Sequence, residues 1–431
     1  MANESIMGAP PVHVLIPRGD VSEEDGDLSV DEATDECCSS ENEDEQSQKT
    51  ESHFYRWRRR PNAKFPVTFS TSENPIEILT ESPYSQFKQY VEDDLFQYFA
   101  EQTNLYSVEK SGNSINTNAQ EIEQLFGIWL YMGIFTAPSY RDYWSPKTRW
   151  PCIANIMPVN RYEKLMQFFY VCENNKEAKR EDVSYDALFK VRKLFDAVRT
   201  KCREEPQAEF QSIDEQIVPF KGRHSKKQYL PAKPHRWGFK MITRGSSNGV
   251  IYDFVMYAGK DTEVIDPKSD MSTTANCVRT LCKSLPQGLH NIKLFMDNFY
   301  INFELMLHLK KEFHIETTGT VRANRLHGCS LLSEKELKLK GRGACDQMVD
   351  ANSNLTVVRW LDNRAVTLAS THLEAEPFST IKRWDTKQKK NVDVQRPNIV
   401  EVYNTNMGGI DLSDMLLSIY NNQRKSHKWY F

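Results

Sequence analysis

Apolar residues in the first half of the chain recur at the spacing of a helix. Phe87, Val91, Leu95 and Phe99 lie four residues apart, which predicts one helical face across this stretch. Further amphipathic helices are predicted over residues 122–129, 162–171 and 187–198. We therefore expect helices to dominate as far as about residue 205.

From residue 208 onward the pattern becomes that of strands, with shorter apolar runs between turn residues. Strands are predicted over 210–220, 238–243, 250–258, 291–296 and 317–321, the first three as a meander. Helices are predicted over 273–282 and 301–313. Residues 322–400 are rich in short strands and turns, which indicates a separate, mostly β insertion.

The chain then returns to a helical pattern. Asn404, Asn406, Gly408 and Gly409 form a cluster of breaker residues. A helix is predicted over 410–423, with a buried stripe formed by Leu412, Met415, Leu416 and Ile419.

Charge divides the sequence into two parts. Residues 1–54 hold fifteen acids and two Lys or Arg, so their net charge is −13. The whole chain has a net charge of −4, so the remaining residues carry +9. This composition predicts a disordered acidic tail in front of a basic body, which favours a nucleic-acid partner over a membrane. A tail that only keeps the protein in solution is the alternative. The longest apolar run, 125–135, is too short to span a bilayer.

The nine cysteines are scattered, with no CxxC pair. This usage is typical of a reducing compartment, and it argues against a disulfide framework and a zinc finger. Four arginines within five residues, at 56 and 58–60, indicate either a nuclear address or a phosphate contact. A solvated basic patch explains them equally well.

One segment, 216–252, contains no Asp or Glu at all. It predicts a contact with DNA phosphates, because cations interleaved with aromatic residues suit a polyanion. The candidate DNA-binding residues are Lys221, Arg223, Lys226, Lys227, Lys233, Arg236 and Lys240. A solvated basic hairpin beside a core acid is the alternative.

Three acids are placed where a metal site could form. Asp214 lies within a predicted strand, Asp297 ends one, and Asp411 opens a helix, with Asp414 three residues further on. Two-metal phosphoryl transfer needs carboxylates that converge from separate elements. Each of these acids alone is more often a cap, turn or surface residue.

The blocks that carry these acids resemble the catalytic blocks of piggyBac-type DDE transposases. They are SIDEQIVPFKGR at 212–223, MDNFY at 296–300 and YNTNMGGIDLSD at 403–414. Supporting blocks are similar at 141–145, 233–240, 318–322 and 358–362. The seven blocks occur in the right order, and the resemblance covers about residue 80 to the end.

The resemblance implies an α/β fold with an RNase H-like core that an insertion interrupts. It implies cleavage and strand transfer of DNA at TTAA targets with two Mg²⁺ or Mn²⁺ ions, in a nuclear protein that forms a homodimer. Asp214, Asp297 and Asp411 match the catalytic triad, and Asp414 matches a further metal-binding acid. The expected regions are a tail 1–54, a helical dimerisation and DNA-binding region 55–205, core segments 206–321 and 401–431, and the insertion 322–400.

Members of this family continue past the segment that matches 428–430, and they often add a Cys/His-rich zinc-binding domain. The chain stops at Phe431, so we expect it to lack that domain and the helices that complete the core. The sequence therefore leaves open an active or formerly active transposase and a domesticated nuclear DNA-binding protein without turnover. A metal-dependent RNA or structure-specific nuclease would share the core but not the seven blocks.

Overall fold

The structure is a computed structural model of the chain. It describes residues 54–59 and 82–419, except for single positions 180, 183, 187, 232, 234, 269 and 387. These residues belong to one of the two units into which the chain divides, Ser52–Phe431. The prediction of a disordered tail over 1–54 lies outside the described residues except for Phe54, and so does the end of the last predicted helix, 420–423.

Helices form the first part of the described chain, as the apolar spacing predicts. They are α1 Pro83–Tyr90, α2 Asp93–Ser111, α3 Ala119–Ile134, α4 Pro151–Ala154, α5 Val159–Phe168 and α6 Arg192–Glu204. Their apolar faces share one core, in which Phe99, Leu125 and Leu165 are fully buried. The Asn118 side chain caps α3 by accepting a hydrogen bond from the Glu121 amide.

The boundaries of these helices differ from the prediction. The expected single helix across 87–99 is two helices, because Val91 leaves the helical conformation and Glu92 is extended. Val91, Leu95 and Phe99 are nevertheless all buried, so the spacing correctly identifies a shared face. The helix expected over 162–171 ends at Phe168, and the one expected over 187–198 begins at Arg192.

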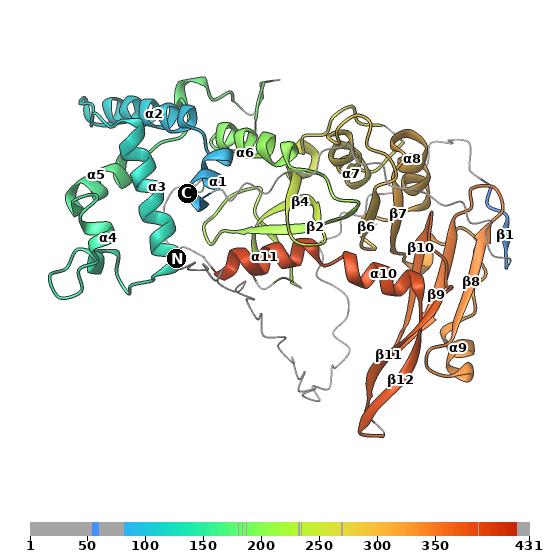
Figure 1. Ribbon diagram of the computed structural model, residues 1–431. Coiled ribbons are helices and arrows are strands. Elements are labelled where there is room, and N and C mark those ends of the chain that lie inside the picture. The colour runs from blue at the N-terminus through green and yellow to red at the C-terminus, as the bar shows by residue number, and fades with distance from the viewer. Residues whose placement is uncertain are drawn as a thin grey trace, which may run out of the picture. The chain divides into compact units, whose positions relative to one another are not determined.

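A ten-stranded mixed sheet forms the second part, and the fold is therefore α/β (Figure 1). Its strands are β1 Trp57–Arg58, β2 Phe210–Pro219, β3 Gln228–Tyr229, β4 Trp237–Ser246, β5 Ile251–Met256, β6 Lys293–Met296, β7 Glu316–Thr320, β8 Cys345–Asp350, β9 Thr356–Leu361 and β10 Ala365–Ser370. Their order is β1-β8-β9-β10-β7-β6-β2-β4-β3, with β5 also on β4. The predicted meander is confirmed, since β4 pairs antiparallel with both β2 and β5.

Two helices pack with this sheet around the largest core, in which Val278, Phe303 and Leu309 are buried. They are α7 Thr273–Lys283 and α8 Phe303–Phe313, which lie side by side (Figure 1). Helix α8 connects β6 to β7, and these two strands pair in parallel, as expected when a helix supplies the crossover.

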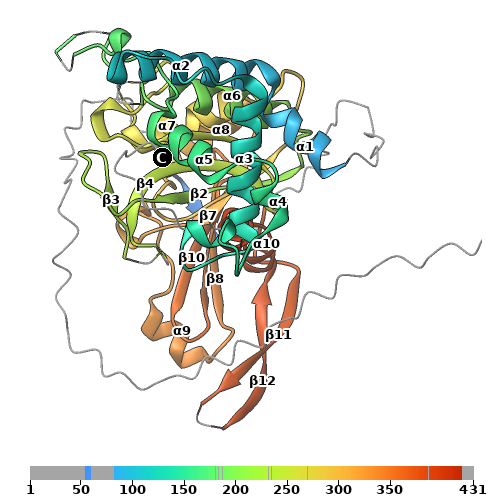
Figure 2. The same cartoon turned by 90° about the vertical axis from the view of Figure 1, so that its left-hand side faces the viewer.

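The strands of the predicted insertion do not form a separate sheet. Strand β10 pairs antiparallel with β7, so β8, β9 and β10 extend the same sheet that contains β2 and β6. A strand pattern in the sequence shows the exposed and buried faces, but not which neighbour the strand will pair with. A short helix, α9 Glu334–Lys340, precedes β8. Only β11 Phe378–Asp385 and β12 Lys390–Pro397 form a sheet of their own, a hairpin that extends beyond the large sheet (Figure 2).

The last described helices correct two further predictions. Asn404 and Asn406 do not break the chain, because they belong to α10 Asn398–Asn406, and the break falls at Met407 and Gly408. In α11 Gly409–Ile419 the expected buried stripe is wrong. Leu412 is only partly buried, Met415, Leu416 and Ile419 are exposed, and the buried positions are Gly409, Ile410 and Ser413. Within the described part of the chain, each helix is too short or too polar to cross a bilayer.

Candidate active site

The register of the central strands brings the first two predicted acids together. Strands β2 and β6 pair in parallel, with Ile213 opposite Met296. Asp214 and Asp297 directly follow this last pair along β2 and β6. We therefore expect them to lie side by side on the same face, about 5 Å apart along the hydrogen-bonding direction. The Asp297 carboxylate accepts a hydrogen bond from the Phe299 amide at 2.8 Å, which fixes it in the turn after β6.

The third acid comes from a helix that approaches the sheet closely. Gly409 opens α11 against the turn between β4 and β5, where a Cβ would lie only 2.1 Å from the Ser246 carbonyl oxygen. Glycine is therefore required at this position for packing. Ile410 is fully buried beside that turn. Asp411, the next residue, lies on α11 where this helix packs beside β2 and β4, and 65% of its side chain stays exposed.

A lysine connects this third acid to the first. The Lys233 ammonium donates to Asp411 Oδ1 at 2.7 Å and lies 4.0 Å from Asp214 Oδ2. The two carboxylate oxygens are therefore at most 6.7 Å apart, which is the sum of the two distances. The structure thus places Asp411 across Lys233 from Asp214, and Asp297 directly after the strand that pairs with β2, although these three acids are not close enough together to hold one ion.

The predicted fourth acid lies beside a cavity of about 630 Å³. Asp411 and Asp414 line this cavity with Lys233 and His235, and its apolar walls include Val218 and Met415. Two of the four predicted acids, Asp411 and Asp414, therefore line this cavity, whereas Asp214 and Asp297 do not.

Sequence reasoning missed a group of residues directly behind the acids. Glu215 follows Asp214, and its carboxylate accepts a hydrogen bond from the buried Lys240 ammonium at 3.0 Å. That ammonium also lies 4.1 Å from the centre of the Phe299 ring. Tyr300 is buried next to Glu215. The sequence does offer a signal, because Glu215 and Tyr300 belong to the same two blocks as Asp214 and Asp297.

Burial without a matching cation changes the ionisation of these groups. Burial raises the pKa of Asp214, and the hydrogen bond shared with Glu215 raises it further. Burial, followed by the charge of Glu215, raises the pKa of Asp297. For Glu215 burial alone would raise the pKa, but hydrogen bonding with Asp214 and the charge of Lys240 lower it overall. The site therefore has more carboxylate oxygens than positive charge to neutralise them.

The donor set suits a hard divalent cation, because carboxylate oxygens are the ligands that Mg²⁺ and Mn²⁺ prefer. As they stand, the described residues include no three His, Cys, Asp or Glu side chains close enough together to hold an ion. The chemistry of the acids therefore fits a metal, but Lys233 and Asp411 would have to move for all three acids to bind one.

The seven candidate DNA-binding residues of the acid-free segment divide into two groups. Lys221, Arg223 and Arg236 are exposed, so they are available to a phosphate backbone. The other four have partners within the protein. Lys226 pairs with Asp261, Lys227 donates to the Gly222 carbonyl, Lys233 pairs with Asp411, and Lys240 pairs with Glu215. Because Lys240 is buried, it does not belong to the predicted DNA-binding surface.

The arginine run at the start of the described chain is partly built into the sheet. Trp57 and Arg58 form β1, which pairs with β8, and Arg59 forms an ion pair with Asp346 at 2.5 Å. More than half of the Arg59 side chain remains exposed. Its location at a sheet edge is compatible with a phosphate contact.

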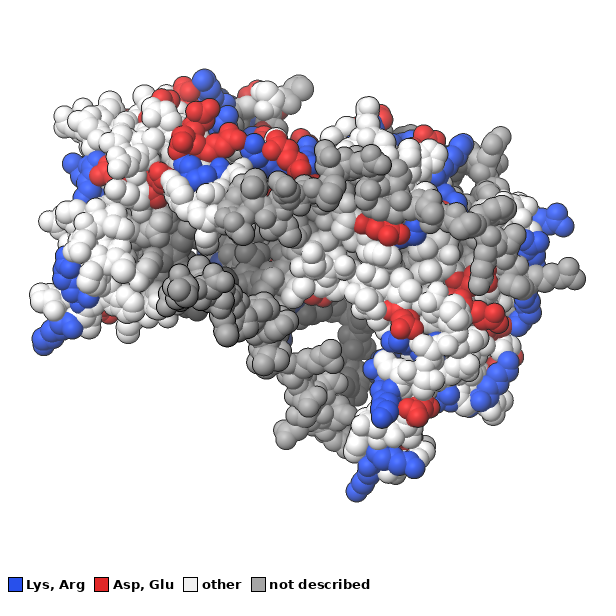
Figure 3. All heavy atoms as spheres, viewed as in Figure 1, with Lys and Arg blue, Asp and Glu red and all other residues white. Residues whose placement is uncertain are grey.

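A second concentration of cations lies on the hairpin β11–β12. Figure 3 shows Lys and Arg side chains over this hairpin, and its exposed cations include Lys382, Lys389 and Lys390. Trp384 is exposed on the same hairpin.

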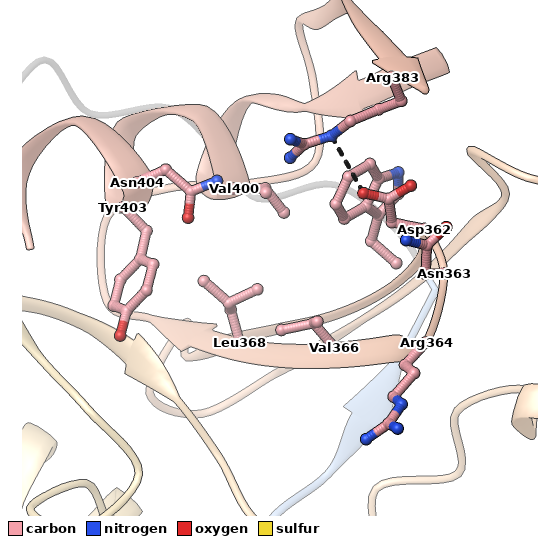
Figure 4. A pocket seen from close by; sticks show the side chains of 10 residues that line it. Asp362, Asn363, Arg364, Val366, Leu368, Arg383, Val400, Tyr403 and Asn404 are labelled. Atoms are coloured by element: carbon pink, nitrogen blue, oxygen red, sulfur yellow. Dashed lines mark ion pairs between the residues drawn. The ribbon is translucent and has the colours of Figure 1, made fainter. Parts of the chain in front are cut away.

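A cavity of about 370 Å³ lies beside the hairpin, lined by β10, α10, the turn after β9 and Arg383 of β11 (Figure 4). Tyr403 and Asn404 reach it from α10, and an ion pair of 3.1 Å between Arg383 and Asp362 closes one side. This cavity contains none of the predicted catalytic acids.

Comparison with known proteins identifies the family of the chain. The sequence model of the family described as transposase IS4 matches residues 82–431. Human PiggyBac transposable element-derived protein 3 is 28% identical over 381 residues, which cover 87% of this chain and 63% of that protein. Human PiggyBac transposable element-derived protein 2 is 28% identical over 372 residues, covering 84% and 61% respectively. The chain thus spans less than two thirds of the length of these relatives.

A solved structure is similar in fold. It is the cryo-EM structure of a piggyBac transposase synaptic complex with hairpin DNA, which matches with a TM-score of 0.66 at 21% identity and covers 81% of this chain and 70% of that chain. The family match extends over most of the described chain and includes all four acids. The chain therefore belongs to the transposase IS4 family, and within it to the piggyBac type.

Proposed function

We propose that this chain is a piggyBac-type DDE transposase-derived protein that cleaves DNA and transfers strands at TTAA targets. One observation carries the proposal. Asp214, Asp297 and Asp411 come from β2, the end of β6 and α11, which are far apart in sequence, and yet β2 pairs with β6 and Lys233 joins Asp411 to Asp214. Catalysis of phosphoryl transfer by carboxylates requires such convergence.

The proposal includes an RNase H-like core. Its support is the strand order β5-β4-β2-β6-β7, in which three antiparallel strands are followed by two strands parallel to β2. The helices before residue 205 would then form the dimerisation and DNA-binding region. The strands after residue 322 would form the insertion, although three of them hydrogen-bond into the core sheet.

Each acid has a different task in this proposal. Asp214 and Asp297 supply oxygens from a rigid sheet, and Asp411 closes the site from α11. Two Mg²⁺ or Mn²⁺ ions, when bound, would activate the attacking oxygen and stabilise the leaving oxygen. Lys240 holds Glu215 in place next to Asp214, and its ammonium lies over the Phe299 ring.

DNA is the proposed substrate, bound by a homodimer in the nucleus. The exposed Lys221, Arg223 and Arg236 lie in the same chain segment as Lys233 and would neutralise backbone phosphates near the acids. Affinity should then fall steeply with salt, by a slope of about 0.9 for each phosphate neutralised. Replacing Arg223 and Arg236 with alanine should make that slope shallower.

The test is cleavage of a duplex that carries TTAA, with Mg²⁺ or Mn²⁺, by the full chain. Cleavage should disappear in Asp297→Asn and in Asp411→Asn, and persist in the matched control Asp393→Asn, which changes an exposed acid on β12. Metal should also raise the melting temperature of the wild type but not that of Asp297→Asn, because the ion relieves repulsion between buried carboxylates. Cleavage that survives Asp297→Asn would contradict the proposal.

A second candidate is a domesticated DNA-binding protein without turnover. One observation favours it, namely that the described residues form no three-ligand metal group as they stand. In this case the salt-dependent binding of DNA would remain, while neither metal would support cleavage or raise the melting temperature.

A further inference from the structure

Lys233 occupies an unusual position among the cations of its segment. Its side chain is only 16% exposed, although it lies in the connection between β3 and β4, and it faces carboxylates from two other elements. Its ammonium is 2.7 Å from Asp411 on α11 and 4.0 Å from Asp214 on β2. Among the described cations of this segment, it alone has ion pairs with two of the predicted metal ligands.

This position is the one that a divalent ion would need. An ion bound by both Asp214 and Asp411 has to lie between carboxylate oxygens that are at most 6.7 Å apart in this structure. Metal–oxygen bonds are about 2.0–2.1 Å for Mg²⁺, so the ion would have to occupy the space that the ammonium fills. Two cations cannot share that space, since both their volumes and their charges conflict.

We propose that Lys233 is a positioning residue that holds Asp411 against Asp214 as an internal cation, and that its ammonium must leave before the site takes up a divalent ion. This inference rests on the proposed function of the acids as metal ligands. It adds that Lys233, a residue of the segment proposed to contact DNA, keeps a divalent ion out of the site until its ammonium moves.

The same chain segment indicates what would release the lysine. Lys233 is three residues from the exposed Arg236, and His235 lines the cavity with it. A DNA phosphate that enters the cavity offers Lys233 another anion, so the ammonium can transfer from Asp411 to the phosphate. DNA binding would then strengthen metal binding, and by linkage metal would strengthen DNA binding by the same factor.

The experiment is a calorimetric titration of the full chain with Mn²⁺ alone, in the absence of DNA. In Lys233→Met the competing cation is gone, so Mn²⁺ should bind at least about fivefold more tightly than to the wild type, the lower end of typical coupling between two sites. In Lys233→Arg the cation remains, and the affinity should stay near that of the wild type. The matched control is Lys226→Met, which removes a similarly enclosed lysine paired with Asp261, away from the acids.

A second measurement keeps the test decisive if Lys233→Met does not fold. The wild type should bind Mn²⁺ at least about fivefold more tightly when a short duplex is present than when it is absent. Equal affinities of the wild type and a folded Lys233→Met, with weaker binding in Asp297→Asn, would overturn this inference and leave the metal site intact. If neither the wild type nor Lys233→Met binds Mn²⁺, with or without DNA, the proposed function fails and this inference fails with it.

Discussion

Asp214 and Asp411 belong to the same site but are held in very different ways. Asp214 is in the middle of β2, between β4 and β6, and only 14% of its side chain is exposed. Asp411 is on the first turn of α11 and is 65% exposed. Behind Asp214 lie the fully buried Ile213 and Ile242, whereas the side chains of Met415 and Leu417 that follow Asp411 are exposed.

The difference indicates a site with one fixed side and one adjustable side. Asp214 lies in β2 between two paired strands, and the Phe299 amide fixes Asp297 in the turn after β6, so their separation changes only if the sheet or this turn deforms. The position of Asp411 depends on the close contact at Gly409 and on a single lysine. A catalytic carboxylate has to be held within about 0.5 Å of its working position, and we expect α11 to reach that precision only when the site is occupied.

The largest expected effect concerns the buried ion pairs that join β5 of the sheet to helix α6. Asp253 on β5 is completely buried, and it accepts from Arg199 of α6 at 2.6 Å and from Arg203 at 3.1 Å. Asp253→Asn leaves buried guanidinium charge without its partner, so the free energy of unfolding should fall by about 3–5 kcal/mol in chemical denaturation. Glu334→Gln, which breaks a solvent-exposed pair with Lys338, should leave the free energy of unfolding nearly unchanged. Equal losses in the two variants would mean that burial does not distinguish these ion pairs.

The next effect concerns the core directly behind Asp214. Ile213 is fully buried among residues of β4, β6 and α7. Ile213→Ala removes buried methyl groups from a packed core, and it should lower the free energy of unfolding by about 3 kcal/mol. A loss below about 1 kcal/mol, measured by the same denaturation, would show that the fixed side is less tightly packed than the comparison requires.

A smaller effect should appear with pH, again on the sheet side. Burial, with added repulsion from Lys293 and Lys310, lowers the pKa of His372 from 6.5 to about 3. Between these two pH values His372 is therefore neutral in the folded protein and protonated in the unfolded chain. The stability from this group is fully present above pH 6.5, and it is lost as pH falls from 6.5 toward 3. Between pH 7 and pH 5 the loss should be about 1–2 kcal/mol.

The quantity to compare between the wild type and the control variant is the slope of the unfolding free energy against pH, not its absolute value. His372→Asn should flatten the decrease between pH 7 and pH 5, whatever it does to stability at pH 7. Identical slopes for the variant and the wild type would show that His372 takes up a proton in the folded state.

The fixed side is also the part that the sequence predicts best. The strand patterns over 210–220 and 291–296 locate β2 and β6, and acids within them or directly after them identify Asp214 and Asp297 as candidates. Their adjacency follows once the two strands are paired in parallel. The pairing itself is not in the local pattern, and for the same reason the sequence did not place β8, β9 and β10 in the core sheet.

On the adjustable side, the sequence predicts neither the burial of the α11 residues nor the contact between Lys233 and Asp411, for a physical reason. Helical periodicity states which residues of α11 share a face, but not whether another element covers that face. Leu412, Met415, Leu416 and Ile419 do have helical spacing, yet the last three are exposed. The contact between Lys233 and Asp411 joins residues 178 positions apart, and no local pattern carries that information. Lys233 was identified only as one basic residue among seven.

The smallest expected effect tests whether α11 is as loosely packed as this comparison requires. Leu417 is 62% exposed and lies beside two cavities, one of which contains Asp411. Leu417→Ala removes little buried surface, so the free energy of unfolding should change by less than about 0.5 kcal/mol. The contrast with about 3 kcal/mol for Ile213→Ala would then measure the difference between the two sides. A loss of 2 kcal/mol or more would mean that Leu417 is covered in solution, by a second copy of the chain or by residues 420–431. In that case Asp411 would be held as firmly as Asp214, and the site would be fixed on both sides.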